Sequence, residues 1–161
     1  MIKHLRIDNR LIHGQVAVTW MNSIGAEAII VVNDKVAADP LQKMALPLAA
    51  RGNKVLVFSH AEMQQYAKEN PNETMLVIAK NPDDALELIN SGLEIEFVNV
   101  GNAAPVHGTT FKMVTNSIAV TAENAAVYRQ IAELRGGKLT SRMTPFTDEI
   151  DFLAALKSAG L

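Results

Sequence analysis

The sequence predicts a single α/β domain built on a largely parallel β-sheet. Short apolar runs of strand length alternate along the chain with amphipathic runs of helical length, which is typical of a parallel sheet covered by helices on both faces. One run, residues 28–32, is Ala-Ile-Ile-Val-Val, and an uninterrupted β-branched run indicates a strand buried on both sides. No linker, repeat or low-complexity segment divides the chain, so we expect one domain over residues 1–161.

Five apolar runs are expected to form the central strands. Each has the length of a strand, is rich in branched apolar side chains and is bounded by residues typical of turns. The runs cover residues 2–7, 28–32, 54–58, 74–79 and 95–100. The region from Gly101 to Val120 is the least regular part of the chain. Further short strands are expected at residues 111–114, 117–120 and 138–143.

Helix start and stop signals separate these strands. Asp39-Pro40 places an N-cap residue before a proline at the first helical position, and Asn81-Pro82 repeats that order. Ser59 and Glu62 have the spacing of a capping box, and Gly25 is expected to end the first helix. The expected helices begin near Gln15, Asp39, Ser59, Asn81, Thr121 and Thr147.

Composition excludes several classes of function. The net charge is −2 and no basic block is present, which argues against nucleic acid as a partner. Cysteine is absent, so disulfides and thiolate chemistry are excluded, as is usual in a reducing cytoplasm. The first residues lack the apolar core of a signal peptide, and the longest apolar run, residues 28–32, is far too short to cross a bilayer. We therefore expect a cytoplasmic protein.

The chemically richest stretch follows the first strand. Residues 6–16 are Arg-Ile-Asp-Asn-Arg-Leu-Ile-His-Gly-Gln-Val, in which a buried strand turns polar and then gives way to a helix. A histidine at this place lies at the crevice where open α/β sheets bind ligands. The free N–H groups and the dipole of the following helix favour a phosphoryl group there. His13 is therefore the candidate nucleophile for phosphoryl transfer, against the plainer alternative of a histidine bonded only to backbone.

Neighbouring residues are expected to assist His13. Arg10 is the candidate charge clamp, because its planar guanidinium can hold two phosphoryl oxygens. Gly14 permits a tight turn and a close approach of the backbone to phosphate, and Gln15 is expected to act through its backbone N–H. Asp8 is expected either to orient the imidazole or to brace the loop through Arg10 or Arg6. Bracing is favoured, since a carboxylate beside a phosphoryl group repels it.

Three further residues follow strands and are expected at the same edge of the sheet as His13. Gly101 would let the backbone approach the phosphate. Asp34 and Ser59 are supporting candidates, although capping a turn or a helix is a sufficient explanation for each. His107-Gly108 repeats the His-Gly pair, but no cysteine or close acidic residue completes a set of metal ligands. We expect no metal site.

Two other classes of protein remain as alternatives. A nucleotide- or cofactor-binding α/β module would carry G-x-G-x-x-G or G-x-x-x-x-G-K-[ST], and neither motif is present. We therefore expect no cofactor. A receiver-like signalling domain phosphorylated on aspartate needs acidic residues at strand ends, whereas the third predicted strand ends in Phe58-Ser59.

The pattern R-I-D-x-R-L-I-H-G-Q-V at residues 6–16 resembles the signature of the mannose/fructose/sorbose-type enzyme IIB of the bacterial sugar phosphotransferase system. Residues 31–34, 39–40 and 98–101 also resemble that family, so the resemblance runs the length of the chain. It implies a three-layer α/β/α fold with a mostly parallel sheet of strand order 3-2-4-1-5-6 and a short antiparallel addition. In that order the first strand is central, which places His13 near a topological switch point.

The resemblance also implies a function. It makes the chain a phosphocarrier in which His13 is phosphorylated on Nδ1 by an enzyme IIA. The phosphoryl group then passes to a sugar held by the membrane components IIC and IID, so the protein would be cytoplasmic and peripherally associated with that transporter. The sugar would be mannose, fructose, sorbose or an amino sugar. Which of them it is, and whether the chain forms a homo-oligomer, the sequence leaves open.

Overall fold

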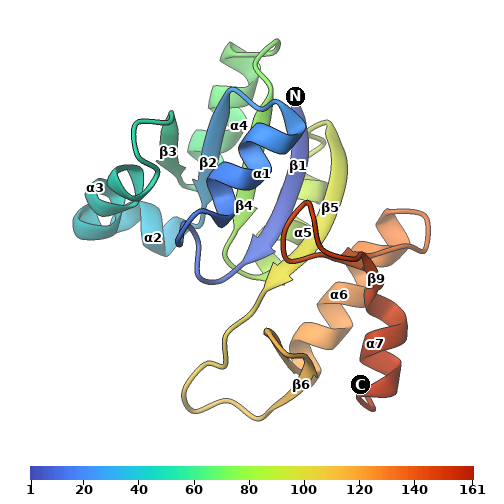
Figure 1. Cartoon of the computed structure of the whole chain (residues 1–161). Coiled ribbons are helices and arrows are strands. Elements are labelled where there is room, and N and C mark those ends of the chain that lie inside the picture. Colours follow the sequence, from blue (N-terminus) through green and yellow to red (C-terminus); the bar gives the residue numbers. More distant parts are fainter.

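The strand that precedes His13 runs through the middle of a seven-stranded sheet (Figure 1). The computed structural model describes all residues, 1–161. The order is β3 (Val55–Phe58), β2 (Ala28–Val32), β4 (Met75–Ala79), β1 (Ile2–Asp8), β5 (Ile95–Asn102), β8 (Thr140–Ser141) and β9 (Ile150–Asp151). All neighbours pair in parallel except β8 and β9, which are antiparallel. The implied order 3-2-4-1-5 is confirmed, and β8 takes the sixth place.

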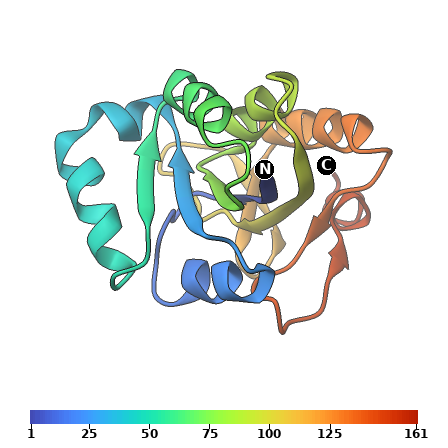
Figure 2. The same ribbon diagram turned by 90° about the horizontal axis from the view of Figure 1, so that it is seen from above.

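Helices cover both faces of this sheet, as Figure 2 shows. One layer contains α1 (Val16–Ile24) and α2 (Asp34–Ala38), with α3 (Pro40–Ala49) beyond the β3 edge. The other contains α4 (His60–Glu69), α5 (Pro82–Asn90), α6 (Ala122–Leu134) and α7 (Phe152–Ser158). None of these helices has both the length and the apolar character needed to span a bilayer.

The central strands are buried on both faces because their side chains alternate between two apolar clusters. In β2, Ile29 and Val31 pack into the cluster under α1, whereas Ile30 and Val32 pack into the cluster under α4 to α7. All five residues of β2 are fully buried. Burying one isoleucine or valine contributes about 1.5–3 kcal/mol, so the continuous β-branched run is what holds the two helical layers together.

Most predicted helix boundaries are confirmed. Gly25 adopts a left-handed conformation (φ 65°) after α1, which an L-side chain adopts only with strain. Ser59 Oγ accepts from the Glu62 amide at 3.2 Å, and the Glu62 carboxylate accepts from the Ser59 amide at 2.7 Å. This capping box fixes the start of α4.

The C-terminal part of the chain differs from the prediction. Thr147 does not start a helix, because its hydroxyl donates to the Thr144 carbonyl in a turn. The last helix, α7, begins five residues later, and Asp151 is its N-cap, accepting from the Ala154 amide. The predicted strand at 138–143 shrinks to the two residues of β8. The short strands β6 (Phe111–Thr115) and β7 (Ile118–Thr121) form a separate antiparallel pair.

Candidate functional site

The loop between β1 and α1, residues 9–15, leaves the carboxyl end of the central strand. Leu11 and Ile12 are each 6% exposed and anchor this loop in the apolar cluster under α1. The Leu11 amide donates to the Asp8 carbonyl at 3.1 Å, and Leu11 has a positive φ of 60°. A left-handed leucine costs about 1–2 kcal/mol, so its packed side chain must hold it there. His13, which follows Ile12, emerges at the surface.

The imidazole of His13 is held by a buried carboxylate. Its Nε2 lies 3.1 Å from Oδ2 of Asp8, whose side chain is 1% exposed, while the His13 side chain is 15% exposed. An ionised carboxylate only accepts hydrogen bonds, so in the neutral imidazole Nε2 carries the proton. Nδ1 then carries the free lone pair, and it has no hydrogen-bond partner in the chain. The ring is thus oriented with one nitrogen reserved for an incoming group.

Asp8 contacts both the imidazole of His13 and the loop, the two roles that were considered for it. Besides orienting His13, its Oδ1 accepts from the Arg10 backbone amide at 3.0 Å. Its Oδ2 also lies 3.2 Å from Nη2 and 3.3 Å from Nε of Arg6. The predicted brace through Arg10 is therefore made by the Arg10 main chain, which leaves the guanidinium of Arg10 exposed and without a partner.

Arg6, which was considered from the sequence only as one possible brace for Asp8, lies beneath the candidate site and pairs with Asp8. Its side chain is fully buried, lies 5.7 Å from the Trp20 ring centre, and donates to Asn99 Oδ1 at 3.0 Å and to the Arg142 carbonyl at 2.9 Å. Burial lowers the pKa of Arg6, and the Asp8 carboxylate partly offsets this. A signal exists in the sequence: charged or polar residues at 4, 6 and 8 alternate with apolar ones, which marks one face of the strand as polar.

Gly101 has a different role from the predicted approach of backbone to phosphate. A Cβ at this position would lie 2.1 Å from Cζ of Arg6. The glycine therefore makes room on β5 for the buried guanidinium rather than for a phosphoryl group. It belongs to the support beneath the site.

The start of α1 is unlike the other helix starts. Gly14 has a positive φ of 52°, which makes the tight turn predicted for it. Gln15 occupies the N-cap position without accepting any hydrogen bond through its side chain, and the first turn holds no acidic residue. The amides of Ala17 and Val18 consequently have no acceptor in the chain. Each of the other helices has a side-chain cap, from Asn33, Asp39, Ser59, Asn81, Thr121 and Asp151.

Such a helix start, with free amides and a positive dipole end beside an unpaired imidazole nitrogen, is suited to bind a phosphoryl group. Over residues 2–161 the chain matches the family described as the PTS system sorbose subfamily IIB component. The chain belongs to this IIB family. A sorbose-type IIB component is a phosphocarrier domain in sugar uptake, and the predicted family is thereby confirmed.

Known IIB proteins agree with this membership along the whole chain. The fructose-specific EIIB component of Bacillus subtilis is 31% identical over 160 residues, covering 95% of this chain and 94% of that one. The mannose-specific EIIAB component of Escherichia coli is 36% identical over 141 residues, covering 85% of this chain and 42% of that protein. The crystal structure of the IIB domain of the Klebsiella pneumoniae sorbose permease superposes with a TM-score of 0.88 at 30% identity, covering 98% and 97% of the two chains.

Asp34 and Ser59 do not join His13 in this IIB domain. Asp34 accepts from the His60 amide at 2.9 Å, and Ser59 caps α4. Both line a separate polar hollow of about 670 Å³, together with His60 and Gln64. Their contacts are explained by local structure, and neither forms a hydrogen bond with His13 or Asp8.

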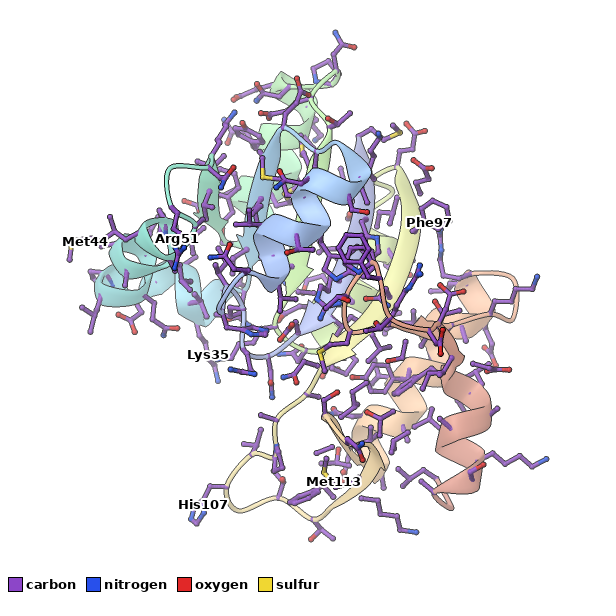
Figure 3. All side chains as sticks on the ribbon, viewed as in Figure 1. Lys35, Met44, Arg51, Phe97, His107 and Met113 are labelled. Carbon is purple, nitrogen blue, oxygen red and sulfur yellow. The ribbon has the colours of Figure 1, made fainter.

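Figure 3 shows where the side chains of His107 and Lys35 lie. His107 lies at the exposed tip of the loop that follows β5 and points into solvent, so it does not form a two-histidine site with His13. Lys35 extends from α2 toward the end of the molecule at which β1 ends. No group of three or more potential metal ligands is found.

Proposed function

We propose that Nδ1 of His13 accepts a phosphoryl group from a phosphohistidine of an enzyme IIA and passes it to a sugar held by the membrane components IIC and IID. The observation that supports this most directly is the His13–Asp8 pair, 3.1 Å apart, which directs Nδ1 away from the buried carboxylate. A two-way carrier needs an acceptor that two partners can reach in turn. The partial exposure of His13 at a loop on the sheet edge meets that need.

In the first step the N–P bond of the donor breaks as the bond between phosphorus and Nδ1 of His13 forms. The proton on Nε2 stays in its hydrogen bond with Asp8. In the second step a sugar hydroxyl attacks phosphorus, the Nδ1–P bond breaks, the hydroxyl proton passes to solvent, and His13 leaves as neutral imidazole. Phosphoryl transfer asks the protein mainly for positioning and charge stabilisation.

The oxygens of the transferred group are bound, in this proposal, by two sets of donors. One set is the amides of Ala17 and Val18 at the start of α1, which have no acceptor in the chain. The unpaired guanidinium of Arg10 supplies the positive charge that offsets the charge on the phosphoryl oxygens in the transition state.

The names of the relatives support the proposed partners and sugar. In the Escherichia coli relative the name EIIAB joins a IIA and a IIB part in one component, which supports a IIA domain as the donor. The relatives are named for fructose, sorbose, N-acetylgalactosamine and mannose, so the substrate is proposed to be an aldohexose, a ketohexose or an amino sugar of that set. The domain would work on the cytoplasmic side, docked on the membrane components.

The test is phosphorylation by phosphoenolpyruvate, the general proteins of the system and a IIA, with the wild-type chain compared with His13→Ala. We expect label to enter the wild type only. His107→Ala, which removes an exposed histidine away from the site, is the matched control and should be labelled normally. The phosphoryl bond should be labile in acid and stable in alkali. Labelling of His13→Ala, or a bond labile in alkali as in an aspartyl phosphate, would contradict the proposal.

A further inference from the structure

A second cavity lies on the other face of β1 from His13. Its volume is about 390 Å³, within the range of small-molecule sites. It is bounded by the end of β1, the starts of α5 and α6, and the β6–β7 pair. Ile7 lines it, whereas the next residue, Asp8, points to the opposite face and His13. Neither His13 nor Arg10 contributes to its wall, so the cavity is distinct from the phosphoryl site.

A tyrosine whose hydroxyl has no hydrogen-bond partner in the chain lines this cavity. Tyr128 lines it and is 1% exposed, with its ring packed edge-on against Phe152 at 4.9 Å. The Tyr128 hydroxyl makes no hydrogen bond with the chain. Burial, and then the charge of Asp83 at the start of α5, raise the pKa of Tyr128, so the hydroxyl stays protonated. Tyr128 Oη is not one of the polar atoms that are shut off from solvent without a partner, so the hydroxyl is open to the cavity and is free to donate to an occupant.

Other polar groups of the wall are also free. The Lys80 ammonium has no acidic partner and no hydrogen bond within the chain, and the Asn124 side-chain amide is unpaired. The two N-cap residues Asn81 and Thr121 line the cavity, so α5 and α6 both begin there. The starts of α5 and α6 are capped and carry Asp83, Asp84 and Glu123 in their first turns, so the charge that suits an anionic group is the unpaired Lys80 ammonium. The amide and the hydroxyl suit neutral hydroxyl groups.

The remaining wall is apolar. Phe111, Ala119 and Pro82 are among the seven hydrophobic residues of fourteen that line the cavity. We propose that this cavity binds a hexose phosphate, with the phosphoryl group at Lys80 and the sugar hydroxyls at Asn124 and Tyr128. The choice of a sugar rests on the proposed function, since a phosphorylated sugar is what the proposed reaction releases on this side of the membrane. The cavity and its unpaired groups do not depend on it.

The wall connects the cavity to the phosphoryl site through one side chain. Asn9 lines the cavity, and its amide group donates to the Ala104 carbonyl and accepts from the Ala104 amide, both at 2.9 Å. Ala104 also lines the cavity, and Asn9 immediately precedes Arg10. An occupant that shifts the Asn9–Ala104 pair would displace the start of the loop that carries Arg10 and His13. Bound product would in this way slow the acceptance of a new phosphoryl group.

The experiment is a titration of the full chain that is monitored by calorimetry and by amide chemical shifts. The probes are the phosphates of fructose, sorbose, mannose and N-acetylgalactosamine, the four free sugars and inorganic phosphate. We expect saturable binding of at least one sugar phosphate, with shifts at Ala104 and Thr121. Tyr128→Phe, which keeps the packed ring, and Lys80→Ala should each weaken binding about 10-fold, as expected for the loss of one hydrogen bond to a charged or buried group. Lys157→Ala, an exposed lysine on α7, is the matched control and should bind normally.

Several outcomes would overturn this assignment. They are no saturable binding of any sugar phosphate, equal affinity for free sugars or for inorganic phosphate alone, and binding unaffected by Tyr128→Phe in a variant whose thermal unfolding is unchanged. His13→Ala separates the two proposals, because it cannot be phosphorylated at position 13 and should still bind the sugar phosphate. Failure of the labelling test would leave the sugar-phosphate binding result in place. Failure of the binding test would likewise leave the labelling of His13 in place.

Discussion

The guanidinium of Arg6 fills the space in which a side chain at position 101 would lie. A Cβ on Gly101 would come within 2.1 Å of Cζ and 2.4 Å of both terminal nitrogens of Arg6. Arg6 in turn pairs with Asp8, and Asp8 holds His13. The absence of a side chain on β5 is therefore linked, through one buried ion pair on β1, to the orientation of the imidazole.

Gly101→Ala should destabilise the fold and slow phosphoryl transfer together. Overpacking a buried site costs about 1–3 kcal/mol, and the displaced guanidinium would loosen Asp8. The measurements are the free energy of unfolding in urea and the rate of labelling by phospho-IIA. Gly25→Ala is the control, because its φ of 65° is strained but nothing lies within 4 Å of its Cβ. It should cost stability without slowing the transfer, and equal rates for the two variants would contradict the link.

Asp8→Asn should leave His13 in place but no longer fix its tautomer. The amide can either donate to or accept from Nε2, so part of the protein would carry the proton on Nδ1. We expect phosphoryl transfer to fall by about 10²-fold or more, as for other histidines that lose an orienting carboxylate. Nitrogen chemical shifts of the imidazole should show the mixed tautomers directly. Asp34→Asn, a carboxylate at the same sheet edge that bonds to His60, should change neither quantity.

Arg10→Ala should leave the fold intact and slow phosphoryl transfer by about 10²-fold, the usual cost of a lost electrostatic stabiliser. The side chain is exposed and its only contact through Asp8 is made by the backbone amide, which alanine keeps. Thermal unfolding and single-turnover transfer rates check this. Transfer at the wild-type rate would remove Arg10 from the mechanism.

Gln15→Asp should stabilise the protein while it reduces activity. A carboxylate at this N-cap position would accept from the free amides of the first turn of α1, which is worth about 0.5–2 kcal/mol. The same amides are proposed to bind the phosphoryl group, which the carboxylate would also repel. Gln15→Asn supplies a neutral cap and should give similar stability with a smaller loss of rate. A rise in melting temperature with unchanged transfer in both variants would show that these amides are not used.

Stability should fall as the pH drops from 6.5 toward 4. Burial, and next the charge of Arg6, lower the pKa of His4 from 6.5 to about 4. Between these values the unfolded chain binds more protons than the folded chain, so acidification favours unfolding, by about 3 kcal/mol in all for this one group. His4→Phe preserves the packing on Trp20, where the ring centres are 4.5 Å apart, and should show a shallower dependence in urea unfolding. The same slope in both proteins would contradict this origin.

The elements that were predicted well are those that local chemistry determines. The run 28–32 became β2 because β-branched residues fill both faces of the sheet, and the Ser59–Glu62 capping box formed as its spacing requires. Thr147 failed as a helix start because Asp151, a stronger cap nearer the apolar residues of α7, was available. The order of the strands is not a local property, and only the resemblance to a family supplied it.

The candidate site residues that one short stretch carries could be placed together from the sequence. His13, Gly14 and Asp8 lie together because they are joined by the same turn. Arg6, Asn99 and the Arg142 carbonyl meet only after three distant segments pair in the sheet, so their partnership is not written in sequence spacing. Gly101 shows the same limit, since its conformation alone gives no hint of the guanidinium beside it.

The only tryptophan of the chain, Trp20, stacks near the Arg6 guanidinium and donates from Nε1 to the Met143 carbonyl at 3.1 Å. An indole that touches the buried ion pair behind His13 senses the field there, and no second indole elsewhere dilutes its signal. The domain thus carries an intrinsic fluorophore beside the Arg6–Asp8 ion pair that holds His13. If His13 is phosphorylated as proposed, we expect the emission of the unlabelled protein to change as the phosphoryl group arrives and leaves, which makes transfer measurable in real time.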